Sequence, residues 1–155
     1  MSTLPLHIAR RLNRVAVLLA PLLASQASRP SGAPLPPWTW RAQPESLRQA
    51  MKCAKAVYVA WDRRGDCLYV GSVCRGHDMA VADRLDEHFR SISNGSGRRA
   101  SWALLSVLPI RANAPIATVR AAEGWAALHL SPQEGSAHPR VDLAVPPRDL
   151  ARALR

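Results

Sequence analysis

The stretch Ala56–Ser72, AVYVAWDRRGDCLYVGS, constrains the fold more than any other part of the chain. Two short apolar runs rich in β-forming residues flank the polar sequence DRRGD, which is typical of a hairpin turn. We therefore expect two neighbouring antiparallel strands, at Ala56–Ala60 and Leu68–Ser72. Each strand carries one tyrosine, Tyr58 or Tyr69, and the chain holds no other.

The next segments add helices and one more strand. Met79–Ile92 has the spacing of one helical face, with apolar residues at Val81, Leu85, Phe89 and Ile92. The glycine-containing sequence SNGSGRR at 93–99 is typical of a flexible loop. Ser101–Ile110 reads as a third strand, and Ala114–Leu130 as a helix that begins around Pro115. The order β-β-α-β-α predicts an α+β fold, a small three-stranded, largely antiparallel sheet flanked by helices.

The flanking regions divide the chain further. Residues 1–27 place arginines ahead of an apolar run, which fits a signal peptide, a transit peptide or an amphipathic helix. The run is too short to cross a bilayer. Residues 28–44 are proline-rich and predict an irregular linker. Residues 45–140 form the predicted folded domain, which opens with a short helix at Glu45–Lys55. Residues 141–155 form a tail with at most a short helix, at Asp149–Arg155.

The formal net charge of +10 favours an anionic partner such as nucleic acid or a membrane surface. Arginine-rich composition is the alternative explanation. Residues 1–53 carry seven basic side chains and one acidic one, whereas residues 54–140 carry eleven and eight. Because most of the excess lies outside the predicted domain, charge alone identifies no nucleic-acid site.

The cysteines Cys53, Cys67 and Cys74 are odd in number and irregularly spaced. This pattern predicts neither a disulfide framework nor a zinc site, and incidental thiols are the better interpretation.

Three polar side chains are candidates for chemistry. Arg84 and His88 lie four residues apart, on one face of the helix predicted at Met79–Ile92. Glu123 shares helical spacing with an apolar stripe made of Ile116, Val119, Ala126, Ala127 and Leu130. A buried, unpaired carboxylate is costly, so Glu123 needs a cation, a metal or a pocket open to water. Arg120, three residues earlier, is the simplest ion-pair partner.

Taken in order, the sequences VYV, LYVGS and DRLDEHF, with Glu123 ahead of LHLSP, resemble the GIY-YIG nuclease family. The resemblance covers about residues 54–140. It implies that Tyr58 and Tyr69 are the tyrosines of the two family motifs and that Arg84 is the family's helix arginine. It also implies that His88 is catalytic and that Glu123 holds a single divalent metal, Mg²⁺ or Mn²⁺.

Several positions depart from the family pattern. The first motif lacks its leading Gly-Ile, and the segment between the second motif and the helix arginine is longer than usual. Ser72 stands where several relatives have lysine, for which Arg75 is a possible substitute. Both are candidate nucleic-acid contacts. Gly135 stands where many relatives have asparagine.

The resemblance predicts a metal-dependent DNA endonuclease that hydrolyses phosphodiester bonds. The alternative is a catalytically weakened domain that binds nucleic acid or a protein. A third interpretation, an exported binding protein, depends on the N-terminal segment alone. DNA is the expected partner, no integral membrane span is expected, and the oligomeric state is left open. The expected location is cytoplasmic by default, with export or organellar targeting as the alternative.

Overall fold

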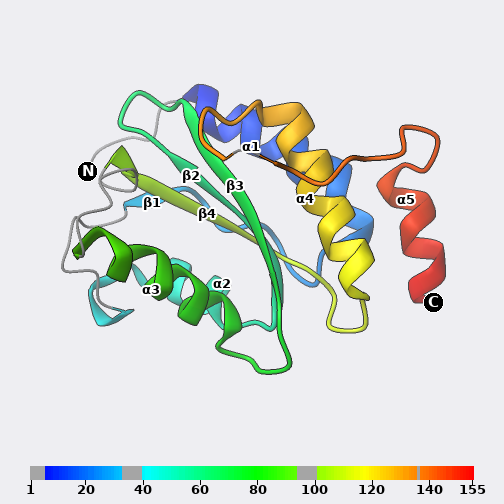
Figure 1. The fold of residues 1–155 in the computed structure, drawn as a ribbon, viewed down its shortest axis with the longest axis horizontal. Coiled ribbons are helices and arrows are strands. Elements are labelled where there is room, and N and C mark those ends of the chain that lie inside the picture. Colours follow the sequence, from blue (N-terminus) through cyan, green and yellow to red (C-terminus); the bar gives the residue numbers. More distant parts are fainter. Residues whose placement is uncertain (1–5, 33–39, 94–100, 136) are drawn as a thin grey trace.

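The computed structural model describes residues 6–32, 40–93, 101–135 and 137–155, which form one antiparallel sheet with helices on both faces (Figure 1). Four strands in these residues follow the order β1-β4-β2-β3. Their bounds are Ser31–Gly32 for β1, Lys55–Trp61 for β2, Cys67–Cys74 for β3 and Leu104–Pro109 for β4. The predicted α+β class is confirmed, and so are its three longer antiparallel strands.

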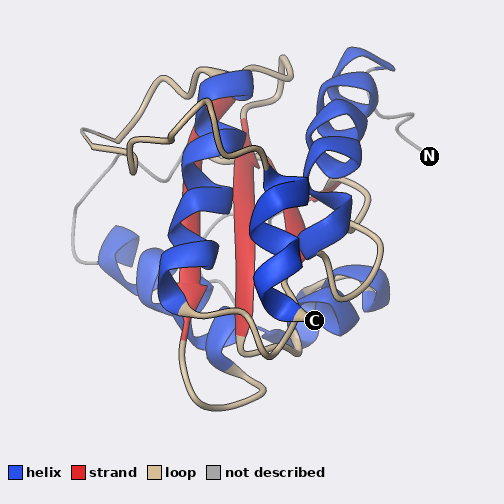
Figure 2. Cartoon of the chain, turned by 90° about the vertical axis from the view of Figure 1, so that its right-hand side faces the viewer, coloured by secondary structure: helices blue, strands red, loops and turns tan. Residues whose placement is uncertain are grey.

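The helices form a layer on each side of the sheet. Their bounds are Leu6–Leu19 for α1, Glu45–Met51 for α2, Ala80–Ser93 for α3, Ile116–Leu130 for α4 and Pro147–Leu150 for α5. Short 3₁₀ turns cover Ala20–Leu22, Trp40–Ala42 and Ala151–Leu154. Helices α1, α4 and α5 lie on one face and α2 and α3 on the other (Figure 1). Figure 2 shows the sheet from the α4 and α5 side.

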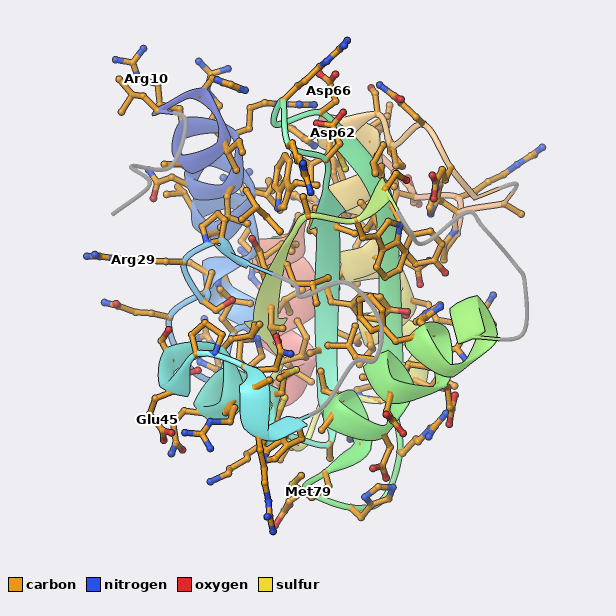
Figure 3. The ribbon with its side chains drawn as sticks, turned by 90° about the vertical axis from the view of Figure 1, so that its left-hand side faces the viewer. Arg10, Arg29, Glu45, Asp62, Asp66 and Met79 are labelled. Atoms are coloured by element: carbon orange, nitrogen blue, oxygen red, sulfur yellow. The ribbon has the colours of Figure 1, made fainter. Side chains whose placement is uncertain are left out.

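The predicted hairpin between β2 and β3 is present. The backbone N–H of Asp62 donates to the carbonyl of Asp66 at 3.0 Å, and the Asp62 carboxylate accepts the N–H groups of Arg64 and Asp66. Figure 3 shows Asp62 and Asp66 at the tip of this turn. Gly65 adopts φ +89°, a conformation that only glycine tolerates readily. The turn chemistry therefore fixes the register of the two strands.

Strand alternation sends the side chains of β2 to two separate cores. Ala56, Tyr58 and Ala60 join the cluster that packs against α2 and α3. The alternate residues of β2, which are Val57, Val59 and Trp61, join the cluster with α1 and α4. Strand β3 alternates in the same way from Tyr69 to Cys74, but the register shift opposite Ala60 and Trp61 breaks the alternation before Tyr69. Leu68 and Tyr69 therefore both join the α2 and α3 cluster, whereas Cys67 joins the other.

The N-terminal segment is an amphipathic helix packed on the sheet. Helix α1 buries Ile8, Leu12, Val15 and Leu19 at spacings of three and four residues. Full burial of such a side chain contributes about 2 kcal/mol. Arg11 also donates to the carbonyl of Leu130 at 2.6 Å and so joins α1 to the end of α4. No helix in the described part of the chain is long and apolar enough to span a membrane.

The expectation that residues 28–44 form an irregular linker is wrong in part. Ser31 and Gly32 pair with Leu105 and Leu104 as the short strand β1. Nearby, the N–H of Ser28 donates to the carbonyl of Val107 at 2.8 Å. The open edge of β4 offers unpaired backbone groups, and this segment satisfies some of them.

Other boundaries differ by a few residues. Helix α4 begins at Ile116 after an extended Pro115, and the C-terminal helix begins at Pro147, two residues before the expected Asp149. Of the predicted loop at 93–99, Ser93 is the last residue of α3. Residues 94–99 and the side chain of Ile92 lie outside the described residues.

Candidate active site

The two tyrosines meet on the α3 side of the sheet. Tyr58 lies opposite Gly71 and Tyr69 opposite Ala60, so the tyrosines are diagonal neighbours across β2 and β3. Their ring centroids are 6.0 Å apart, with 28° between the ring planes. A Cβ atom on Gly71 would lie 2.5 Å from the Tyr58 hydroxyl and 2.7 Å from Cε1 of Tyr69. Gly71 therefore provides the space that the paired rings occupy.

His88 completes this cluster from α3. Its Nε2 lies 2.6 Å from the Tyr58 hydroxyl, a short hydrogen bond. The hydroxyl donates when Nε2 is unprotonated and accepts when Nε2 carries the proton. Tyr58 is 1% exposed and His88 4% exposed, so the surrounding side chains shield the bond from most of the solvent.

Trp102, which precedes β4, forms the wall of the cluster. Its ring centroid lies 5.3 Å from those of both Tyr69 and His88, and its indole N–H donates to Glu134 at 3.3 Å. The sequence interpretation did not identify Trp102, because no short motif or spacing connects it with the tyrosines.

The Tyr58 phenol and the Arg84 guanidinium are electrostatically coupled. Burial raises the pKa of Tyr58 far above its ordinary value, and Tyr69 raises it further, whereas the positive charge of Arg84 lowers it. Arg84 is half-buried and donates to the Glu87 carboxylate at 2.9 Å. The phenol therefore remains protonated until a base beside it accepts the proton, and Arg84 is the nearby cation that favours this ionisation.

Arg75 lies just beyond β3 and binds the same carboxylate. Its two terminal nitrogens lie 2.8 and 3.0 Å from the two oxygens of Glu87. Hydrogen bonds from Arg75 and then from Arg84 lower the pKa of Glu87 to about 2. Arg75 and Arg84 thus share one anion at the surface, beside the buried tyrosine.

Glu123 lies on the opposite face of β3. Its Oε2 accepts a hydrogen bond from the Ser72 hydroxyl at 2.5 Å, and its Oε1 lies 3.6 Å from Nδ1 of His138. Ser72 pairs in register with Val57, on the α4 side of the sheet. In the described residues the partners of Glu123 are therefore Ser72 and His138. The ion pair with Arg120 that the sequence suggested is replaced by these contacts. The predicted apolar stripe is also wrong at Ile116, which is 59% exposed.

The segment after α4 connects the two faces around the edge of β3. The N–H groups of Gln133 and Glu134 donate to the carbonyls of Cys67 and Leu68. A Cβ atom on Gly135, whose φ is +98°, would lie 3.4 Å from Nε2 of His138 and 3.6 Å from a carbon of Tyr69. Gly135 thus lies between Tyr69 and His138, the residue beside Glu123.

Gly124 allows His138 to reach Glu123. A Cβ atom there would lie 2.4 Å from the carbonyl oxygen of Pro139, so only glycine lets the chain pass this close to α4. Sequence reasoning missed His138. The one available signal was a glycine inside a helix directly after the candidate glutamate, which indicates a close backbone approach.

Glu123 fits a divalent metal as a single carboxylate ligand. No group of three or more His, Cys, Asp or Glu side chains gathers in a metal-binding arrangement within the described ranges. Mg²⁺ often keeps several waters and takes one carboxylate from the protein, with substrate phosphates as further ligands. The Ser72 hydrogen bond orients this carboxylate. The three cysteines are free thiols.

A separate cavity of about 570 Å³ lies between α1 and the segment at 23–30. None of the predicted site residues lines it. Its walls are mostly apolar, so it offers no chemistry comparable to that of the tyrosine cluster.

Comparisons with protein families, with curated proteins and with solved structures find no match for this chain.

Proposed function

We propose that this protein is a metal-dependent DNA endonuclease with a GIY-YIG-type active site. The supporting observation is the buried hydrogen bond between Tyr58 and His88, beside Tyr69 and below Arg84. A phenol and an imidazole buried together form a pair able to move one proton. The net charge of +10 fits an anionic partner, a class that includes DNA.

The first role in the proposal belongs to the Tyr58–His88 pair. An ordinary phenol has a pKa of about 10 and is a poor base near neutral pH. His88, with Nε2 unprotonated, accepts the phenol proton, and the Tyr58 oxygen then accepts a proton from the attacking water. Tyr69 positions that water or the phosphate.

The second role belongs to the charged groups around the tyrosines. Arg84 binds a phosphate oxygen and stabilises the negative charge that grows in the transition state. Glu123, oriented by Ser72, would hold Mg²⁺ or Mn²⁺, and such an ion supplies Lewis acidity when bound. Ser72 and Arg75 are the proposed additional nucleic-acid contacts.

The test is relaxation of supercoiled plasmid by purified protein, with Mg²⁺, with Mn²⁺ and with EDTA. The variants are Tyr58→Phe and Glu123→Ala, and the control is Glu45→Gln, an exposed acid on α2. We expect cleavage by the native protein and the control, and loss of about 100-fold or more in the two variants and in EDTA. Cleavage that persists in both variants would contradict the proposal.

A non-catalytic binding module is the second candidate. Ser72 and Gly135 stand where several members of the family that the chain resembles have lysine and many have asparagine. Tyr58 is also buried. If plasmid stays intact while Glu123→Ala leaves salt-sensitive DNA binding unchanged, the binding module is the better description.

A further inference from the structure

One carboxylate holds two arginines at the rim of the tyrosine cluster. Glu87 contacts Arg75 through both of its oxygens, and one of these oxygens also accepts a hydrogen bond from Arg84. Arg84 and Glu87 lie three residues apart on α3, whereas Arg75 comes from the segment after β3. The fold therefore gathers two guanidinium groups from different elements around one anion.

This arrangement differs from the other ion pairs of the described surface. Arg48 with Glu45 and Arg152 with Asp149 are each single pairs of residues three apart. In the Glu87 cluster the side chains of Arg75, Arg84 and Glu87 are 36%, 38% and 41% exposed, so solvent and ligands reach them. Exposed ion pairs add little to stability, and a stronger anion can replace the carboxylate.

A phosphodiester is the anion that suits two such arginines. Its two non-bridging oxygens accept paired N–H bonds from guanidinium groups, as a carboxylate does. Asp83 also acts on Arg75, and its carboxylate lies 3.7 Å from Nε2 of His77. Without the Glu87 charge, the two guanidinium groups would lose the carboxylate that they share.

The position of the cluster links it to the proposed chemistry. Arg84 is close enough to Tyr58 to lower the pKa of the phenol. A phosphate bound by Arg84 would therefore lie beside the buried tyrosine and His88. In this respect the inference rests on the proposed function.

We propose that Arg75 and Arg84 form a phosphodiester-binding site that Glu87 occupies in the free protein. The DNA backbone displaces the Glu87 carboxylate and takes over its hydrogen bonds. Glu87 thus acts as an internal competitor, which weakens DNA binding and limits it to phosphates that engage both arginines.

The experiment measures the affinity for a fluorescent DNA duplex in EDTA, where cleavage does not interfere. It compares Glu87→Gln with Glu45→Gln, because both changes remove one negative charge from a helical acid paired with an arginine three positions away. Figure 3 shows Glu45 on α2, apart from α3. Glu87→Ala is a second variant that removes the carboxylate from the two arginines. The double variant Arg75→Gln with Glu87→Gln tests whether the gain in affinity depends on Arg75. Thermal melts confirm that each variant is folded.

We expect Glu87→Gln to bind DNA several-fold more tightly than Glu45→Gln, and Arg75→Gln to cancel that gain. This gain in affinity should shrink when the salt concentration rises from about 50 to about 200 mM, by about threefold for each phosphate contact that Glu87→Gln adds. The reason is that the logarithm of the affinity falls with the logarithm of the salt concentration, with a slope of about 0.9 per contact. Equal affinities of the two glutamine variants, or tighter binding that survives Arg75→Gln, would overturn the inference.

Plasmid relaxation separates this result from that of the proposed function. Tighter binding by Glu87→Gln without any cleavage supports the phosphodiester site and rejects the nuclease. Cleavage with equal binding by the two glutamine variants rejects the site and keeps the nuclease. If no variant binds DNA at about 50 mM salt, the inference is wrong.

Discussion

Gly71 lies directly opposite Tyr58 across β2 and β3, and its lack of a side chain makes room for the Tyr58 ring. A Cβ atom at this position would lie 2.5 Å from the phenol oxygen and 2.6 Å from the adjacent ring carbon. The second tyrosine motif is therefore also a packing motif. Its glycine is needed so that the two tyrosines and His88 can share one side of the sheet.

Gly71→Ala should displace Tyr58 and lower the free energy of unfolding. Overpacking of this kind costs about 1 to 3 kcal/mol. Gly76→Ala is the matched control, because a Cβ atom there meets no atom within 4 Å. Chemical denaturation of both variants checks the prediction, and equal stabilities would contradict it.

Tyr58→Phe should be destabilising and, under the proposed function, inactive. The change removes the hydroxyl from the 2.6 Å bond to His88 in a buried site. Loss of such a partner costs about 1 to 3 kcal/mol. Tyr69→Phe, at a half-buried position, should cost less. Urea unfolding of the two variants provides the comparison, and a larger loss of stability in Tyr69→Phe would contradict the prediction.

Glu87 should make the free energy of unfolding depend on pH in the acidic range. Because its pKa is lowered from 4.5 to about 2 in the folded protein, its contribution is present above about pH 4.5 and is lost as the pH falls towards 2. The side chain is 41% exposed, so solvent screening keeps the contribution below about 1 kcal/mol.

The measurement for Glu87 is the unfolding free energy between about pH 5 and pH 2. The difference between the native protein and Glu87→Gln should shrink over this range, and added salt should reduce it. A difference that grows as the pH falls would mean that the carboxylate is not stabilised by the two arginines.

Gly124→Ala should destabilise the protein although it replaces glycine inside a helix. In an open helix this change stabilises by up to about 1 kcal/mol. Here the new Cβ would lie 2.4 Å from the Pro139 carbonyl, so the segment that carries His138 must move away from Glu123. We expect a lower melting temperature and, under the proposed function, weaker metal-dependent cleavage. A more stable variant with full activity would refute the close approach.

Local sequence signals were sufficient for the hairpin and the tyrosine pair. The turn residues between Trp61 and Cys67 and the alternation in both strands act over short distances, so they predict that Tyr58 and Tyr69 lie near one another. The regular spacing in α3 likewise placed Arg84 and His88 one turn apart. These predictions hold because each depends on neighbours in the chain.

The surroundings of Glu123 were not predictable in this way. Helix α4 is apolar on nearly every side, with Val119, Trp125 and Leu130 among its buried residues, so periodicity does not define which face points inward. Ile116 was consequently predicted to face the core, whereas its side chain is exposed. His138 joined the site only because the chain beyond α4 passes close to Gly124.

By itself, then, the sequence determined the strand pair, the α+β order and the proximity of Tyr58 and Tyr69. The tertiary structure alone decided that His88 bonds to Tyr58, that Trp102 closes the cluster, and that Glu123 meets Ser72 of the edge strand β3. The physical reason is that these contacts join residues far apart in the chain. Their geometry depends on how whole helices rotate and dock on the sheet, which no local pattern records.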